Sequence, residues 1–306
     1  MKENAPGPPV LIVGSLAFDS VETPDGSVEM ALGGSAAYAS IAASYFAGAR
    51  VVGVVGDDFG DEHMRRLQAH GIDVAGVARV PGKTFHWRGR YHHDFKGRDT
   101  LETALGVFES FDPDVPAPHR ESEYVLLGNI DPALQLKVLE QAHRARVVAM
   151  DTMNFWIETA RERLAEVLSR VDILFINDEE AFQLSGQSTV LAAARAVAAA
   201  GPRYVVVKRG DCGAMLFGPD LTLFVPAMPL LRVIDPTGAG DSFAGGFMGH
   251  LARTGALDRA SLGGALLAGT VLASFAVEAF SVDGICELPP GAIAERRAAL
   301  ERMIRL

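Results

Sequence analysis

The sequence predicts an α/β protein built around a mostly parallel sheet. From residue 124 to residue 208, short apolar runs alternate with helical segments, which is typical of parallel strands whose connecting helices cover both faces of a sheet. Residues 10–14, Val-Leu-Ile-Val-Gly, form a short apolar run bounded by prolines and glycine, as expected for a strand buried on both faces. Ligands of such sheets bind beyond the C-terminal strand ends, where this chain places Asp19, Asn129, Asp151, Asn177 and Lys208.

Composition limits the size of the fold and the class of partner. The 306 residues suffice for one large domain with a small addition, and 49% apolar with 22% charged residues is typical of a folded protein. A net charge of −10 and a pI of about 5.3 argue against nucleic acid as the partner, because phosphate backbones need a basic face. A small anionic ligand held by backbone amides remains compatible with this charge.

The cysteines and the apolar segments predict a cytoplasmic protein without a membrane partner. Cys212 and Cys286 are too far apart to indicate a disulfide framework or a zinc site. Residues 1–9 are polar and rich in proline, so we expect a loose tail rather than a signal peptide. Residues 262–277 carry no charge but are shorter than the roughly 20 residues of a membrane-spanning helix, which favours a buried helix.

The remaining elements follow from apolar periodicity and from glycine stops. The predicted strands are residues 28–32, 50–56, 124–127, 147–150, 173–176 and 204–208. The predicted helices are residues 35–46, 57–69, 133–143, 157–169, 179–184, 189–200, 242–253, 260–279 and 291–306.

Residues 84–92 interrupt this alternation. Phe85, Trp87 and Tyr91 fall on one side of a period-two pattern, and His86, Arg88, Arg90 and His92 fall on the other. A turn at Lys96-Gly97 and a return strand within residues 100–107 would complete a small antiparallel sheet. We expect His86, His92, His93 and Asp94 to be exposed side chains of this sheet rather than metal ligands.

Residues 235–243, Asp-Pro-Thr-Gly-Ala-Gly-Asp-Ser-Phe, form a tight glycine-lined turn at the start of a helical run. Such a turn directs backbone N–H groups outward at a helix N-terminus and so makes an anion site. A carboxylate beside a bound phosphate is suited to act as a base on the attacking group, and Asp241 is the candidate. The alternative is an ordinary glycine-rich turn in which Asp241 caps the helix.

This stretch resembles the C-terminal signature of the PfkB-type carbohydrate kinases, in the ribokinase-like superfamily that phosphorylates sugars and nucleosides with ATP. The family commonly has Thr at the position of Pro236. The resemblance implies a three-layer ribokinase-like fold with a small β-sheet lid, and use of ATP with Mg²⁺. It also implies an anion hole at Gly238, Ala239 and Gly240, with Asp241 as the general base.

The resemblance extends to residues elsewhere in the chain. It places the substrate near Asp19, the double glycine Gly33-Gly34, Tyr38 and Asn129. It places the nucleotide and its metal near Asn177, Glu180, Lys208, Gly210 and Thr237, with Glu180 holding Mg²⁺ through water and with Asp235 and Thr237 at the K⁺ site of some relatives. Many sugar-binding relatives have Asn at the position of Tyr38, so this ring either contacts a flat substrate or packs inside.

The resemblance also implies a division into parts. The core comprises residues 10–19, 35–81 and 109–306, and the lid comprises residues 20–34 and 82–108. A lid excludes water from the acceptor alcohol, and in several relatives it forms a homodimer contact, which we expect here.

We therefore predict a kinase that transfers the ATP γ-phosphoryl group to a primary hydroxyl of a small sugar or nucleoside. The helix N-terminus is expected to keep Asp241 ionised near neutral pH. We expect Tyr38, Asn129, Asn154 and Trp156 to help define the pocket, and the two aromatic residues point towards a ligand with a flat ring. An adenosine-type nucleoside kinase rather than a sugar kinase is therefore one alternative. A non-catalytic ligand sensor on the same fold is the other alternative. A Rossmann dehydrogenase and a Walker-type NTPase are disfavoured, because neither G-x-G-x-x-G after the first strand nor GxxxxGK[ST] is present.

Overall fold

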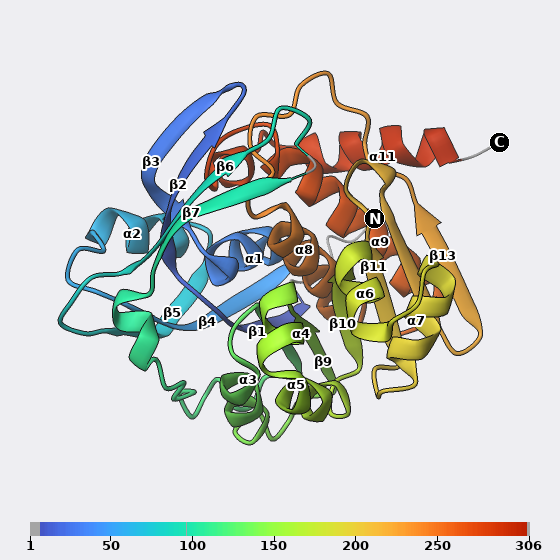
Figure 1. Ribbon diagram of the computed structural model, residues 1–306, viewed down its shortest axis with the longest axis horizontal. Helices are drawn as coiled ribbons and strands as arrows, with labels where there is room; N and C mark the ends of the chain where they lie inside the picture. Colours follow the sequence, from blue (N-terminus) through green and yellow to red (C-terminus); the bar gives the residue numbers. More distant parts are fainter. Residues whose placement is uncertain (1–6, 96, 305–306) are drawn as a thin grey trace.

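The computed structural model describes residues 7–95 and 97–304, and its main feature is a nine-stranded sheet with helices on both faces (Figure 1). The strand order is β13-β12-β11-β10-β9-β8-β1-β4-β5; the pairs β11–β12 and β12–β13 are antiparallel, and the other neighbouring pairs are parallel. The strands are β1 (Gly7–Val13), β4 (Ala47–Val55), β5 (Ile72–Arg79), β8 (Tyr124–Leu127), β9 (Val147–Asp151), β10 (Ile173–Asn177), β11 (Tyr204–Lys208), β12 (Ala214–Gly218) and β13 (Leu221–Val225). The predicted α/β fold with a mostly parallel sheet is confirmed.

Alternate residues of the central strand β1 point into two separate hydrophobic clusters. Val10 and Ile12 belong to one cluster, whereas Leu11 and Val13 belong to the other, and all four are fully buried. Because successive side chains of a strand point to opposite faces, β1 is covered on both sides and the molecule has three layers.

The helices divide between these two faces. On the Ile12 side the cluster includes residues of α1 (Ser35–Ser44), α2 (Asp61–Ala69), α8 (Ala239–Thr254), α9 (Arg259–Ala276), α10 (Asp283–Cys286) and α11 (Ala292–Ile304). On the Leu11 side it includes residues of α3 (Pro132–Leu139), α4 (Asn154–Thr159), α5 (Arg161–Leu168), α6 (Asp178–Ser185) and α7 (Val190–Ala198).

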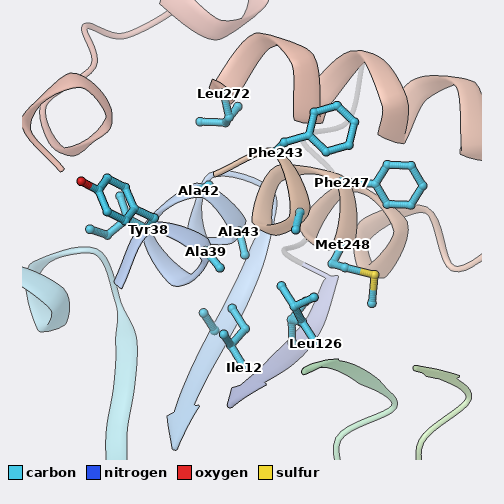
Figure 2. Packing of buried hydrophobic residues seen from close by; sticks show 14 of the residues in the cluster. Ile12, Tyr38, Ala39, Ala42, Ala43, Leu126, Phe243, Phe247, Met248 and Leu272 are labelled. Atoms are coloured by element: carbon cyan, nitrogen blue, oxygen red, sulfur yellow. The ribbon is translucent and has the colours of Figure 1, made fainter. Parts of the chain in front are cut away.

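Small residues let α1 and α8 pack very closely on the Ile12 side. Figure 2 shows Ala39, Ala42 and Ala43 of α1 beside Phe243, Phe247 and Met248 of α8, with Ile12 and Leu126 of the sheet beneath them. A Cβ at Gly245 would collide with the carbonyl oxygen of Ala39, and one at Gly249 would lie 2.7 Å from that of Ala43. This close contact fixes the position of the N-terminus of α8.

A second sheet of four strands lies over one end of the large sheet (Figure 1). Its order is β3-β2-β6-β7; β2 and β6 are parallel and the other pairs antiparallel. The strands are β2 (Ala17–Thr23), β3 (Gly26–Gly33), β6 (Phe85–Tyr91) and β7 (Arg98–Ala104), and the short 3₁₀ helix η1 (Gly106–Ser110) follows them. Residues 20–34 and 82–108, assigned to a lid from the sequence, include most of this sheet.

The aromatic residues of β6 are covered within the chain. Phe85 stacks on Phe108 with ring centroids 5.5 Å apart, the guanidinium of Arg98 lies 5.6 Å from the centroid of Trp87, and Tyr91 is buried. The expected alternation is interrupted by a register shift between Arg88 and Gly89. This face of β6 is therefore not an open apolar surface.

Several element boundaries differ from the sequence-based expectations. The helix predicted for residues 157–169 is two helices, α4 and α5, separated at Ala160, whose ψ of 32° is not helical. β1 begins at Gly7, so residues 7–9 of the expected tail are part of a strand, while residues 1–6 lie outside the described residues, as do Lys96 of the predicted turn and the last two residues of the predicted terminal helix. β5, β12 and β13 were not predicted, nor was β2 as a strand.

Helix α9 meets the length and composition of a membrane-spanning helix, but 67% of its apolar window is buried inside the protein. It packs against α8, and its apolar residues from Leu262 to Ala276 belong to the same cluster as Ile12. In this fold α9 is a core helix.

The close packing of α1 on α8 gives a test of stability. We expect Gly245→Ala to lower the free energy of unfolding by about 2–3 kcal/mol, because the added methyl group has no room beside Ala39. Gly263→Ala on α9 is the matched control, because its nearest neighbour would be a Leu223 methyl group at 3.7 Å and alanine favours the helix by about 0.5–1 kcal/mol. Urea unfolding measures both; equal stabilities of the two variants would contradict the proposed packing.

Candidate active site

The polar residues predicted at strand ends gather at one edge of the large sheet. Asp151, Asn177 and Lys208 are the last residues of β9, β10 and β11, which are neighbouring parallel strands. Asp19 lies in β2, just beyond the C-terminal end of β1. The N-terminus of α8 meets this edge, since the side chain of Lys208 would lie 3.1 Å from a Cβ built on Gly240.

The turn at residues 235–241 leads directly into α8. The helix begins at Ala239 rather than at the predicted Ser242, with Gly238 as its N-cap at φ 74°. Asp241 therefore lies in the first turn of the helix, among the amides that have no partner within the helix. This is the arrangement expected for an anion hole next to a carboxylate.

The ring of Tyr38 packs against this turn. Tyr38 is 1% exposed, and its ring lies so close to Gly238 that a Cβ there would collide with three ring carbons. Figure 2 shows the ring at one end of the buried cluster with its hydroxyl pointing away from the other labelled residues, and that hydroxyl is buried without a hydrogen-bond partner. Tyr38 thus packs under the turn, and in this conformation it has no open space in which to stack on a ligand.

Asp241 is only partly exposed, and burial raises its pKa to about 7. The neighbouring Asp151 carboxylate raises it further, whereas Lys208 and Arg98 oppose the shift. The expectation that the helix N-terminus keeps Asp241 ionised near neutral pH was too simple, because loss of solvent outweighs the amides.

Asp19 is a second carboxyl of this kind. It is 6% exposed, and burial raises its pKa to about 7, with further contributions from Asp235 and Asp241. A Cβ at Gly33 would collide with the Asp19 carboxylate, and the amide of Gly34 hydrogen-bonds to it. The double glycine thus lets the backbone contact Asp19 directly.

Two serines hold this double glycine in place. The Ser35 amide donates to Ser15 Oγ at 3.0 Å, and the Ser15 amide donates to Ser35 Oγ at 3.1 Å. Gly34 is at φ 90° and is the N-cap of α1, and a Cβ there would lie 2.5 Å from the Ser15 carbonyl oxygen. The segment that holds Asp19 is therefore rigidly fixed.

Lys208 and Asp151 form a buried ion pair at the centre of the site. Lys208 Nζ donates to Asp151 Oδ2 at 2.6 Å, and the two side chains are 18% and 8% exposed. Burial alone would lower the pKa of Lys208, but Asp151 and Glu180 raise it, so the ammonium is charged. A fixed positive charge therefore lies beside Gly240.

Asn177 and Glu180 form a capping box on α6. Asn177 Oδ1 accepts from the Glu180 amide at 2.7 Å, and Glu180 Oε2 accepts from the Asn177 amide at 3.0 Å. Burial raises the pKa of Glu180 to about 7, Lys208 lowers it and Asp151 raises it. Both predicted residues therefore have a structural role in the helix, and Glu180 keeps one carboxylate oxygen outside the box.

Asp235 and Thr237 lie at the start of the turn. Asp235 Oδ1 accepts from the Thr237 amide at 2.9 Å, and the buried Oδ2 has no hydrogen-bond partner. Thr237 Oγ1 donates to the hydroxyl of Tyr91 at 3.2 Å.

The other predicted residues surround this centre. Gly210 begins the 3₁₀ helix η2 (Gly210–Cys212) at φ 50°, and a Cβ there would meet only open space. Asn129, just after β8, accepts from Trp156 Nε1 of α4 at 3.0 Å, while Asn154 is exposed at the start of α4.

Two charged residues of the site were not identified as functional from the sequence. Asp151 had been noted only as a polar strand end, although its partner Lys208 ends β11, two strands away at the same edge of the sheet. Arg98, at the start of β7, opposes the rise in the pKa values of Asp19, Glu180 and Asp241. An isolated arginine in a turn gives no signal in a single sequence, because its place over the site depends on how β7 pairs with β6.

Comparison with known proteins gives consistent likenesses. The chain is 33% identical to a cytidine kinase of Thermococcus kodakarensis over 251 residues, covering 80% of this chain and 88% of the relative. It is 27% identical to a nucleoside kinase of Methanothermobacter thermautotrophicus over 272 residues, covering 78% and 81%. The adenosine kinase structure from Sinorhizobium meliloti superposes with a TM-score of 0.80 at 21% identity, covering 95% of this chain and 99% of that one, which shows the shared fold.

The fold and these likenesses define a phosphotransferase that acts on hydroxyl groups. The chain belongs to the pfkB family of carbohydrate kinases, whose family model matches residues 9–287. The predicted enzyme class is confirmed.

The buried ion pair gives a second test. We expect Lys208→Met to lower the free energy of unfolding by about 3–5 kcal/mol, because it leaves the Asp151 carboxylate buried without its partner. The double variant K208M/D151N, in which the uncompensated charge is also removed, should recover part of this loss. Thermal and urea unfolding measure both, and a double variant no more stable than K208M would show that the unpaired charge is not the cause.

Proposed function

We propose that this protein is a nucleoside kinase that transfers the γ-phosphoryl group of ATP to a primary hydroxyl of a nucleoside. The observation that carries the proposal is the position of Asp241 in the first turn of α8, beside the amides of the turn at residues 238–241. A site for the in-flight phosphoryl group and a base for the acceptor hydroxyl are then provided by one short segment.

In this mechanism Asp241 accepts the proton of the attacking hydroxyl. The amides of the turn and the N-terminus of α8 stabilise the negative charge on the transferred group. The ammonium of Lys208, fixed by Asp151, adds a positive charge next to Gly240. The Asp19 carboxylate accepts a hydrogen bond from a second hydroxyl of the substrate and so orients the substrate.

The residues present fit ATP with Mg²⁺. Mg²⁺ is commonly held by one or two carboxylates together with phosphate oxygens and water, and the free carboxylate oxygen of Glu180 lies in a buried site with Lys208 and Asp151 nearby. Bound Mg²⁺ supplies charge neutralisation of the phosphates. Gly210, with open space around it, supports the assignment of the β11 end to the nucleotide.

The residues at Asp235 also fit a monovalent cation. A fully buried carboxylate oxygen without a hydrogen-bond partner is costly unless a cation or water satisfies it. We therefore propose that K⁺ binds at Asp235 and Thr237.

A nucleoside rather than a free sugar is supported by the named relatives and by one surface feature. Two of the relatives described above are named as a cytidine kinase and a nucleoside kinase. Phe155 is 50% exposed and lies edge-on to Trp156 with ring centroids 4.8 Å apart, and Trp156 is tied to Asn129 at the C-terminal end of β8. This aromatic pair is the group that we propose to contact the base.

We further propose that the second sheet is the lid, with residues 20–34 and 82–108 moving over a core of residues 10–19, 35–81 and 109–306. Exposed apolar side chains of the sheet, Met30 at 46% and Leu101 at 43%, support a homodimer through this lid. A cytoplasmic location is consistent with this proposal.

An acceptor panel tests the proposed substrate class. Purified protein with ATP and Mg²⁺ is assayed for ADP release with cytidine, adenosine, inosine, ribose, fructose and 2-dehydro-3-deoxygluconate, and we expect a nucleoside to give the highest kcat/KM. Asp241→Asn should lower kcat about 1,000-fold with unchanged folding, whereas Asp258→Asn, at the exposed N-cap of α9, should change it less than about twofold because Asn caps equally well. Highest activity with a sugar would refute the nucleoside assignment, and full activity of D241N would refute the base.

The raised pKa of Asp241 predicts a particular pH profile. A base must be deprotonated, so kcat/KM should be constant above pH 7 and fall about tenfold per pH unit below it, because the free protein binds a proton at Asp241 with a pKa of about 7. A fall steeper than tenfold per unit would indicate that Asp19 must also be ionised. A profile that stays flat down to pH 5 would contradict the assignment of Asp241.

A further inference from the structure

A side-chain hydrogen bond joins the β6–β7 hairpin of the second sheet to the turn at residues 235–241. The hydroxyl of Tyr91, at the end of β6, accepts from Thr237 Oγ1 at 3.2 Å, although the two residues are 146 positions apart in the chain. The other side-chain hydrogen bonds that link the second sheet to the C-terminal half of the described chain involve the β2–β3 hairpin, through Asp25 and Leu32. Tyr91 is thus the contact that reaches the turn itself.

Thr237 is held between the core and the second sheet. Its amide donates to Asp235 Oδ1 at 2.9 Å on the core side, and its hydroxyl bonds to Tyr91 on the other side. The next residue is Gly238, whose φ of 74° and contact with the Tyr38 ring leave little freedom. A rotation of Thr237 would therefore move the first amides of α8.

The same hydroxyl also contacts the cation of the second sheet. Arg98 is the ladder partner of Tyr91 and hydrogen-bonds to it, and its guanidinium lies over the Trp87 ring. Trp87 is in turn the ladder partner of Asp19. Burial raises the pKa of Tyr91, so at neutral pH the group at this junction is an uncharged hydroxyl.

We propose that Tyr91 is a positioning residue that aligns the anion-binding turn when the second sheet covers the site. With the hairpin lifted, Thr237 loses its outer partner, so its side chain and the peptide unit before Gly238 can reorient while the Tyr38 ring still holds Gly238. With the hairpin closed, the hydroxyl fixes Thr237, and the amides of Gly238 and Gly240 point at the phosphoryl site, while the Ala239 amide donates to the Pro236 carbonyl. Closure over the acceptor and completion of the anion hole then occur together, so transfer to water is disfavoured while the site is open. This role rests on the proposed phosphoryl transfer.

A purely structural role for Tyr91 would lie in its buried ring rather than in its hydroxyl. Tyr91→Phe keeps the ring and removes only the hydroxyl oxygen, so it separates the contribution of the ring from that of the hydroxyl. We expect kcat to fall about tenfold while KM for the acceptor changes less than about twofold, since a hydrogen bond made to align the turn acts on the transition state more than on substrate binding. The matched control is Tyr45→Phe, which removes another partly buried hydroxyl, bonded to the Ile285 carbonyl away from the turn, and it should leave both constants within about twofold of wild type.

A double-mutant cycle tests whether the hydroxyl acts through Thr237. Thr237→Val should also lower kcat about tenfold, and Thr237→Ser, which retains a hydroxyl, should restore most of it. If the two groups act as one contact, Y91F/T237V should lose about tenfold rather than the roughly hundredfold product of two independent losses. An additive double variant, or a Y91F enzyme with wild-type kcat, would overturn the proposal.

Hydrogen–deuterium exchange gives a readout that does not depend on catalysis. In the ligand-free protein, Y91F should exchange faster than wild type in a peptide that covers residues 235–243, and Y45F should not. Absence of phosphoryl transfer from wild type to every acceptor in the panel would refute the proposed function, and the exchange result would still decide whether Tyr91 holds the turn. Unchanged exchange in Y91F would refute the positioning role even if the enzyme is active.

Discussion

The contact of the Tyr38 ring with Gly238 is the constraint on which the site depends. It requires a residue without a side chain at the N-cap of α8, in a conformation with positive φ that glycine adopts freely. The close packing of α1 on α8, which Gly245 and Gly249 permit, brings the two elements to this distance. The helix N-terminus is thereby fixed against the core, and its free amides face the edge of the sheet where the strands end.

The electrostatics of the site follow from placing several carboxyls in a partly enclosed space. Burial raises the pKa values of Asp19, Glu180 and Asp241 to about 7, and the ammonium of Lys208 and the guanidinium of Arg98 limit the shift. Such a site is strained without ligands, since carboxylates that repel each other are held together. A substrate with hydrogen-bond donors and a positively charged metal ion would both reduce this repulsion. Phosphoryl transfer depends on such compensation of negative charge.

Much of the fold was predictable because its signals are local. The strand at residues 124–127 was placed with the bounds that the structure has, and the glycine-rich turn was identified as the start of a helix. The missed strands β12 and β13 are five residues each, with too little periodicity to stand out. The break at Ala160 was missed because the apolar pattern continues across it.

The sequence by itself determined the fold class and the residues of the turn, because glycine content and apolar periodicity act within a few positions of the chain. The tertiary structure decided which side chains meet: Lys208 with Asp151, Tyr38 with Gly238, and Tyr91 with Thr237. It also decided the protonation of Asp241, for which the helix amides visible in the sequence count less than the loss of solvent. These are effects of distance and burial, which arise only when segments far apart in the chain pack together.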